Sequence, residues 1–277
     1  MVLTSACATQ TGEIAMAAHI DTPEAWYMEA NNIVVTENGW LSEIDDAQLT
    51  ALVREALENN RDLTKAQGRL NRARASLWQS EAAQLPSLRA DSSNQVSEGF
   101  DGGEDTSSYG LTLAASWELD VWNRLSHATA ASQLSVRSSE ADYQSVRLLI
   151  AANTAQAYFQ LIEAHRLAEV ERSNLASLEE TLGFVSIQFE RGLRSSEDIA
   201  LIRADVETAR ASLDQAEQAK RNASRAIEVL VGRYPATEMT FAGPVPHRPV
   251  TSFVGQPAAL LEQRPDIQSA KFLFLAE

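Results

Sequence analysis

The sequence is poor in cysteine, glycine, proline and basic residues, and it contains no long apolar run. A single cysteine among 277 residues cannot form a disulfide within the chain. With 12 glycines, 8 prolines and 44% hydrophobic residues, the composition is globular rather than disordered and sufficient for one or two domains. A net charge of −15 argues against nucleic acid as a partner. No stretch approaches the roughly 18 consecutive apolar residues of a transmembrane helix.

The four histidines give no sign of an active site. His19, His127, His165 and His247 are scattered along the chain, without metal-ligand spacing and without a nucleophile motif. We expect His127 and His165 to lie on solvated or packed helix faces. The sequence therefore predicts a protein that is not an enzyme and that has no catalytic, metal or cofactor site.

Cys7 is a candidate for covalent modification. The residues before it, Leu3-Thr4-Ser5-Ala6, resemble a bacterial lipobox, in which small residues precede a cysteine that becomes acylated. Thr4 replaces the usual aliphatic residue, and only six residues precede Cys7, which is too short for a signal peptide. Two interpretations stand. Either residues 1–40 form an N-terminal segment with its lipid on Cys7 and its true beginning further upstream, or the cysteine is incidental.

Residues 109–121 alternate strictly between apolar side chains and small or polar ones. The odd positions are all apolar, namely Tyr109, Leu111, Leu113, Ala115, Trp117, Leu119 and Val121. A period of two places these side chains on one face of a strand. Taken alone, the segment is either a membrane-spanning strand, which needs about 9–11 residues, or a long strand of a soluble sheet.

The segment before this strand completes a predicted β-hairpin. Residues 87–97 alternate weakly, and residues 98–108 are rich in glycine, aspartate and serine, as exposed loops are. We therefore expect an antiparallel hairpin over residues 86–122. Its long acidic connection is typical of the outward-facing loops of membrane barrels.

Helical patterns occupy most of the remaining chain. Apolar residues at helical spacing predict helices within residues 41–85, the second running from about Arg61 to Gln84 before Pro86. Within residues 123–232, apolar residues recur every 3.5 residues, as in supercoiled helices, in two runs, Leu175 to Phe189 and Ile199 to Leu230, separated by residues 191–198. Gly192 fits a helix C-cap, and Ser195 or Ser196 fits the next N-cap. The pattern predicts an antiparallel helical hairpin whose first arm is about 100 Å long.

A short internal repeat connects the first third of the chain with its end. Residues 56–66 (ALENNRDLTKA) reappear as residues 260–270 (LLEQRPDIQSA). Between the helical hairpin and the second copy, residues 233–258 contain five prolines and are expected to form an irregular connector. Residues 259–277 are then the beginning of a second structural repeat, and we expect the chain to be a fragment truncated within that repeat.

The strand hairpin, the helical hairpin and the repeat together resemble the outer membrane efflux protein family. These are the TolC-like channels, and the resemblance is to the lipoprotein branch that includes OprM and NodT. Five motifs carry it, in this order: residues 56–63 (ALENNRDL), Leu85-Pro86, residues 117–125 (WELDVWNRL), Arg191-Gly192 with Ser195, and residues 261–267 (LEQRPDI). The resemblance implies a mostly α-helical, TolC-like α/β-barrel protomer with a transmembrane β-hairpin.

The resemblance also implies a function and a set of partners. Family members are homotrimers with a shared twelve-stranded barrel in the bacterial outer membrane and a periplasmic helical tunnel. They are passive exit ducts, joined through a periplasmic membrane-fusion adaptor to an inner-membrane pump. In this picture the membrane strand contributes Leu111, Leu113, Trp117, Leu119 and Val121 toward outer-membrane lipid. The adaptor docks on the tip of the helical hairpin, at Arg191, Gly192, Leu193, Ser195 and Ser196.

Other interpretations stand beside the channel. Helix capping alone explains Gly192 and Ser195 at the tip. The whole chain could be a soluble coiled-coil adaptor or scaffold, in which residues 109–121 would face a soluble core, or a truncated product without function.

Overall fold

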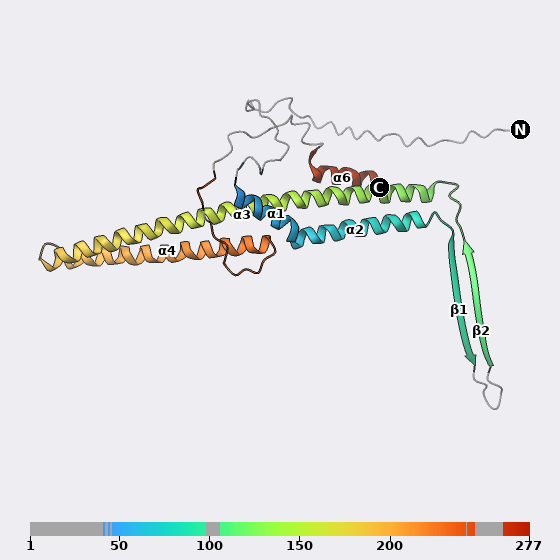
Figure 1. Cartoon of the computed structure of the whole chain (residues 1–277), viewed down its shortest axis with the longest axis horizontal. Coiled ribbons are helices and arrows are strands. Elements are labelled where there is room, and N and C mark those ends of the chain that lie inside the picture. Colours follow the sequence, from blue (N-terminus) through green and yellow to red (C-terminus); the bar gives the residue numbers. More distant parts are fainter. Residues whose placement is uncertain (1–40, 42–43, 45, 98–105, 242, 247–262) are drawn as a thin grey trace, which may run out of the picture.

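The computed structural model describes residues 41, 44, 46–97, 106–241, 243–246 and 263–277, and within these ranges the chain is mostly helical (Figure 1). The elements are α1 (Ala47–Asn59), α2 (Arg61–Ala82), β1 (Ser87–Ser97), β2 (Thr106–Ser116), α3 (Arg124–Glu190), α4 (Ser196–Leu230) and α6 (Pro265–Ala276). The predicted fold class, mostly helical with one β-hairpin, is confirmed. Among the described helices, none combines the length and the apolar character needed to cross a membrane. Cys7 lies outside the described residues.

Side-chain caps define the corner between α1 and α2. The Asp46 carboxylate accepts a hydrogen bond from the Leu49 backbone N–H at 2.9 Å and begins α1. Asn60 separates the two helices, and its Oδ1 accepts from the Asp62 backbone N–H at 2.8 Å to begin α2. The Asn60 amide also donates to the Leu230 carbonyl at 2.9 Å. The corner is thereby tied to the end of α4.

Helix α2 ends at Ala82, two residues before the predicted Gln84. Backbone N–H groups of Gln84 and Leu85 bond to carbonyls three residues earlier, which tightens the last turn before Pro86. Strand β1 begins directly after this proline and pairs antiparallel with β2 along its whole length, from Ser87 with Ser116 to Ser97 with Thr106. The hairpin projects away from the helices (Figure 1).

Helices α3 and α4 form the predicted antiparallel helical hairpin. The first has 67 residues, which corresponds to a length of about 100 Å, and the second returns along it for 35 residues. The stripe predicted on α4 faces α3, and its buried members are Ile199, Val206, Ala209, Ala216 and Ile227. The hairpin tip lies at the end of the molecule remote from the β-hairpin (Figure 1).

The main hydrophobic core lies where α1 meets the middle of α3 and the end of α4. Tyr158, Leu49, Leu161 and Ile227 are fully buried there. The Tyr158 hydroxyl donates to Asp46 Oδ2 at 2.8 Å, so the carboxylate that caps α1 also anchors the central aromatic residue. Burial and the neighbouring Asp46 raise the pKa of Tyr158 above its usual range, and the hydroxyl remains protonated.

The chain after α4 contributes to this core, and α6 packs on a different part of α3. The described part of the connector has no helix or strand, and its Phe241 is buried against Tyr158 with ring centroids 6.1 Å apart. Helix α6 begins with Pro265 inside the repeated motif and packs along α3. The buried hydroxyls of Ser138 and Ser269 are 2.9 Å apart across this contact.

Candidate membrane hairpin and helical tip

The register of the β-hairpin separates it into an apolar face and a polar face. Cross-strand partners share a face, so Leu88 with Ala115, Ala90 with Leu113, Ser92 with Leu111 and Asn94 with Tyr109 all lie on the same side. The opposite side carries Ser87 with Ser116, Arg89 with Ala114, Asp91 with Thr112 and Ser93 with Gly110. The side chains that alternate in the sequence of β2 therefore lie on opposite faces of the paired hairpin.

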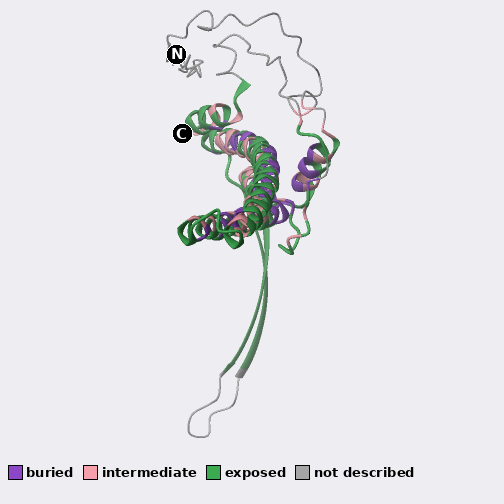
Figure 2. Ribbon diagram, turned by 90° about the vertical axis from the view of Figure 1, so that its left-hand side faces the viewer, coloured by how far each residue is buried: buried purple, intermediate pink, exposed green. Residues whose placement is uncertain are grey.

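Both faces of the hairpin are open to the surroundings. Figure 2 shows the described part of both strands as exposed throughout. Leu111 is 83% exposed, and Tyr109 and Leu113 are 79% and 69% exposed. Apolar side chains in this number, aligned on one side of a sheet, mark a surface that is covered in the functional protein.

The predicted membrane strand, residues 109–121, extends beyond the C-terminal end of β2, which is Ser116. Leu111 and Leu113 belong to β2, whereas Trp117, Leu119 and Val121 follow it and lie in the connection to α3. The apolar alternation continues past Ser116, but its partner strand stops at Ser87 because Pro86 cannot donate to the ladder. Trp117 instead donates its indole N–H to the Gln84 carbonyl at 3.1 Å.

The connection from β2 to α3 is held by side chains. The Asp120 carboxylate accepts from the backbone N–H groups of Leu125 and Ser126, at 3.0 and 2.8 Å, and from the Ser126 hydroxyl at 2.6 Å. Asn123 has a left-handed backbone, with φ of 57°, that turns the chain into the helix. An ion pair between Arg124 and Glu118 spans the same turn at 2.6 Å. These contacts fix how the hairpin leaves the helical bundle.

The tip of the helical hairpin divides into capping residues and free residues. Gly192 has φ of +73°, and its N–H and that of Leu193 bond to the Phe189 and Gln188 carbonyls, which closes α3. Ser195 and Asp198 form a reciprocal capping box that begins α4. The hydrogen bonds from the Ser195 N–H and hydroxyl lower the pKa of the Asp198 carboxyl.

The remaining predicted tip residues take no part in these caps through their side chains. Leu193 is 70% exposed, and Arg191 and Ser196 are exposed as well. The structure brings all five predicted tip residues into one turn, so the turn carries both the capping contacts and a free apolar and basic surface.

Glu228 organises the connector after α4, and sequence analysis did not identify it. The residue is 2% exposed, and its carboxylate accepts from the backbone N–H groups of Thr237, Glu238 and Met239 at 2.9, 2.6 and 3.0 Å. Burial raises the pKa of this carboxyl, but the three N–H groups outweigh burial and lower the pKa below its ordinary value. The only sequence feature that could have indicated this role is the position of an acidic residue directly after Ile227, a member of the apolar stripe.

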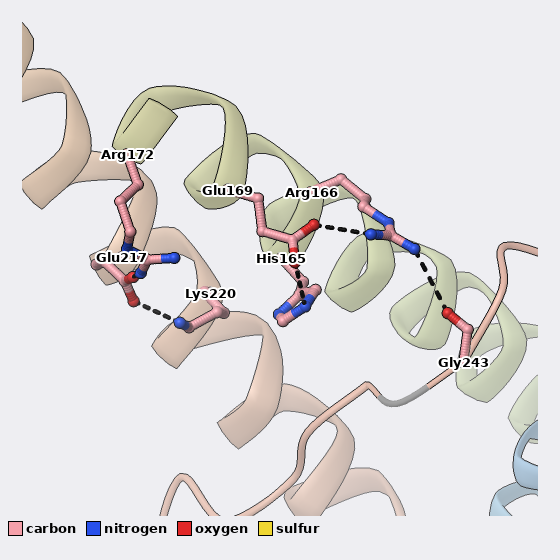
Figure 3. Close-up of polar contacts among 7 residues, drawn as sticks. All are labelled: His165, Arg166, Glu169, Arg172, Glu217, Lys220 and Gly243. Atoms are coloured by element: carbon pink, nitrogen blue, oxygen red, sulfur yellow. Dashed lines mark hydrogen bonds and ion pairs between the residues drawn. The ribbon is translucent and has the colours of Figure 1, made fainter. Parts of the chain in front are cut away.

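Polar contacts hold the connector and the two long helices together (Figure 3). Arg166 donates to Glu169 at 2.8 Å and to the Gly243 carbonyl at 3.4 Å. His165 Nε2 lies 3.4 Å from the other oxygen of Glu169, and its ring contacts Phe241. Glu217 of α4 forms ion pairs with Arg172 of α3 and with Lys220 of its own helix. His165 therefore lies on a packed helix face, and among the described residues no three His, Cys, Asp or Glu side chains converge as metal ligands.

Comparison with known proteins places these features in one family. Residues 52–233 match the family model described as outer membrane efflux protein. The probable outer membrane lipoprotein SilC of Salmonella typhimurium is 28% identical, over 90% of this chain and 56% of its own length. The cation efflux system protein CusC of Escherichia coli is 27% identical, over 92% and 57%. The chain thus spans a little more than half the length of these curated relatives.

Solved structures agree with the sequence comparison. The outer-membrane channel OprN superposes with a TM-score of 0.74 at 26% identity, covering 92% of this chain and 62% of OprN. A structure of CusC gives a TM-score of 0.73 at 25% identity, covering 92% and 61%. The fold described above is therefore that of part of a TolC-like channel protomer.

Proposed function

Because this chain belongs to the outer membrane efflux protein family, we propose that it forms part of a homotrimeric channel in the bacterial outer membrane. The channel is a passive exit duct for small molecules and continues into the periplasm as a helical tunnel. One observation carries the proposal: a hairpin with one apolar and one polar face is joined through a fixed turn to a helical hairpin of about 100 Å.

The two faces of the β-hairpin have the polarity expected of a membrane-barrel strand pair, with one side toward lipid and the other toward a water-filled lumen. In a membrane barrel, strands alternate between apolar side chains that face lipid and polar side chains that face the lumen. The side with Tyr109, Leu111 and Leu113 meets the lipid, and the side with Arg89, Asp91 and Thr112 faces the pore. Each strand has 11 residues, which matches the about 9–11 residues of a tilted membrane strand.

Helix α3 carries an exposed apolar stripe that supports packing between protomers. Leu148, Phe159, Val170 and Phe184 are 52%, 38%, 62% and 61% exposed. Leu148, Phe159 and Val170 follow one another at 11 residues, just over three helical turns, and Phe184 follows Val170 at 14 residues, just under four turns, so these side chains lie along one side of the helix. That side is distinct from the one that packs on α4 through Val185. Neighbouring copies in the trimer cover it.

Detergent dependence and oligomeric state test the channel against a soluble scaffold. We expect the full chain, expressed with an export signal, to fractionate with outer membranes and to elute in detergent at three times the chain mass of 30.3 kDa. A monomer that is fully soluble without detergent would contradict the channel and support the scaffold.

The tip of the helical hairpin is the docking site for a periplasmic adaptor, which connects the duct to an inner-membrane pump. Leu193 is the central contact, because its side chain is 70% exposed and is not used by either helix cap. A photo-crosslinking residue at position 193 should capture the adaptor in cells. The same probe at Val229, which is 60% exposed at the other end of α4, is the matched control. Equal capture at both positions would contradict tip docking.

Cys7 is the acylation site that anchors the N-terminus in the outer membrane. The lipobox-like residues before it support this assignment. Metabolic labelling with a clickable palmitate analogue should mark the chain, and Cys7→Ser should remove the label. Labelling that persists in the variant would contradict the assignment, and absence of label in the unaltered chain would do the same.

A further inference from the structure

The polar face of the β-hairpin carries a single pair of charged side chains within residues 87–96 and 107–116. Arg89 and Asp91 lie two residues apart on β1 and therefore on the same face. The Arg89 Nε donates to Asp91 Oδ1 at 2.8 Å. The other residues of this face within these ranges are uncharged, namely Ser87, Ser93, Gln95, Ser108, Gly110, Thr112, Ala114 and Ser116.

Nothing on the partner strand covers or neutralises this pair. The residue opposite Arg89 is Ala114 and the residue opposite Asp91 is Thr112, and both have short uncharged side chains. The side chains of Arg89 and Asp91 are accordingly 78% and 49% exposed. At about 3.3 Å per residue, Arg89 lies about 10 Å and Asp91 about 17 Å from Pro86, on the half of the strand that is nearer to the helices.

We infer that the Arg89–Asp91 pair determines the ion selectivity of this part of the pore by keeping it electrically balanced. The inference rests on the proposed channel, in which this face lines the lumen. Rings of unpaired acidic side chains favour cations in a pore, and rings of basic side chains favour anions. The described part of this hairpin contributes one charge of each sign per protomer at nearly the same depth. Solutes of either charge sign can therefore pass this level, which suits a duct for chemically varied small molecules.

Removing one partner at a time converts the balanced ring into a charged one. Asp91→Asn leaves one uncompensated Arg89 in each protomer, and Arg89→Gln leaves one uncompensated Asp91. In planar bilayers with a dilute KCl gradient, Asp91→Asn should shift the potassium-to-chloride permeability ratio toward chloride by about threefold. Arg89→Gln should shift it toward potassium by about the same factor. Both shifts should shrink in concentrated salt, where charges are screened over about 3 Å.

Two matched variants preserve the balance and serve as controls. Arg89→Gln with Asp91→Asn removes both charges, and Arg89→Asp with Asp91→Arg exchanges them. Each should keep a permeability ratio close to that of the unaltered chain. Conductance with unchanged selectivity in both single variants would overturn the inference while leaving the channel in place. No conductance from the unaltered chain would overturn the channel itself.

Discussion

The large side chains of the β-hairpin face outward, whereas those of the helical core are enclosed. Leu111 and Leu113 are 83% and 69% exposed, while Leu49 and Ile227 are at 0%. Burying a leucine fully contributes about 1.5–3 kcal/mol, so the helical core is stabilised within the chain. An isolated two-stranded hairpin is at best marginally stable in water. In the proposed channel, lipid and neighbouring strands supply the contacts that the hairpin lacks within this chain.

The polar contacts differ between the two regions in the same way. Around the helical core, Asp46 and Asn60 bond to groups 112 and 170 residues away in the chain, and the buried Glu228 holds the connector that follows α4. On the hairpin, the Arg89–Asp91 pair joins residues two apart and stays open to its surroundings. Polar groups around the core determine how the helices meet, whereas the charged pair on the hairpin is exposed.

Truncation inside the helical core should produce the largest loss of intrinsic stability. We expect Ile227→Ala to lower the free energy of unfolding by about 2–5 kcal/mol, because it leaves a cavity at a fully enclosed site. Urea denaturation followed by helical circular dichroism measures this. Val229→Ala, at a site 60% exposed, should change the value by less than about 0.5 kcal/mol. Equal losses would contradict an enclosed core.

A charge on the apolar face of the hairpin should affect membrane insertion and leave the helices folded. Leu111→Arg should cost about 2–4 kcal/mol if position 111 is near the middle of the bilayer. Thr112→Arg, one residue further along on the polar face, should insert normally. The amount of protein in the outer-membrane fraction reports the difference. If both variants insert equally, the assignment of the two faces is wrong.

Loss of the Glu228 charge should loosen the connector to a smaller extent. Glu228→Gln should cost about 1–3 kcal/mol, because it weakens three hydrogen bonds to backbone N–H groups. Glu207→Gln, at an exposed ion pair, is the control and should have little effect.

The same residue should make stability depend on pH. The folded pKa of Glu228 lies below its ordinary value of 4.5, so its stabilisation is complete above that pH. It is then lost as the pH falls through the folded pKa. The free energy of unfolding can be measured by denaturation at several pH values between about 3 and about 7, which span the titration of carboxyl groups. It should fall more steeply toward acid pH in the unaltered chain than in Glu228→Gln. Parallel curves would contradict this role.

The smallest effect is expected at the tip of the helical hairpin. Ser195→Ala removes the capping box of α4 and should cost about 1 kcal/mol. Ser196→Ala, the next residue and one without a cap contact, should be close to neutral. Hydrogen exchange at the first turn of α4 should report the local loosening. Identical exchange in both variants would show that the cap does not hold the tip.

The elements with a strong period were predictable from sequence, and the ends of elements were not. Apolar alternation identified the faces of β2, and the 3.5-residue repeat identified α3 and α4. The end of β2 differs from the prediction because the alternation continues to Val121, while the last cross-strand pair is Ser87 with Ser116. A single-strand pattern contains no information about where the partner strand ends.

The tip was predictable because its caps are local, whereas the contacts of Asn60 with α4 and of Glu228 with the connector were not. Gly192 and Ser195 act within a few residues of their own positions. Asn60 and Glu228 act on backbone groups that are 170 and 9 to 11 residues away, and their side chains look like ordinary polar residues in the sequence. The partners of these two side chains can be identified only in the folded chain.

Spin-label accessibility along β2 tests the central claim most directly. Single cysteines at positions 108 to 114, in a background with Cys7 replaced, would carry a nitroxide in membrane-reconstituted protein. We expect access to lipid-soluble oxygen to peak at 109, 111 and 113, and access to a water-soluble nickel chelate to peak at 108, 110, 112 and 114. Equal access to both reagents at every position would contradict a hairpin placed between lipid and pore.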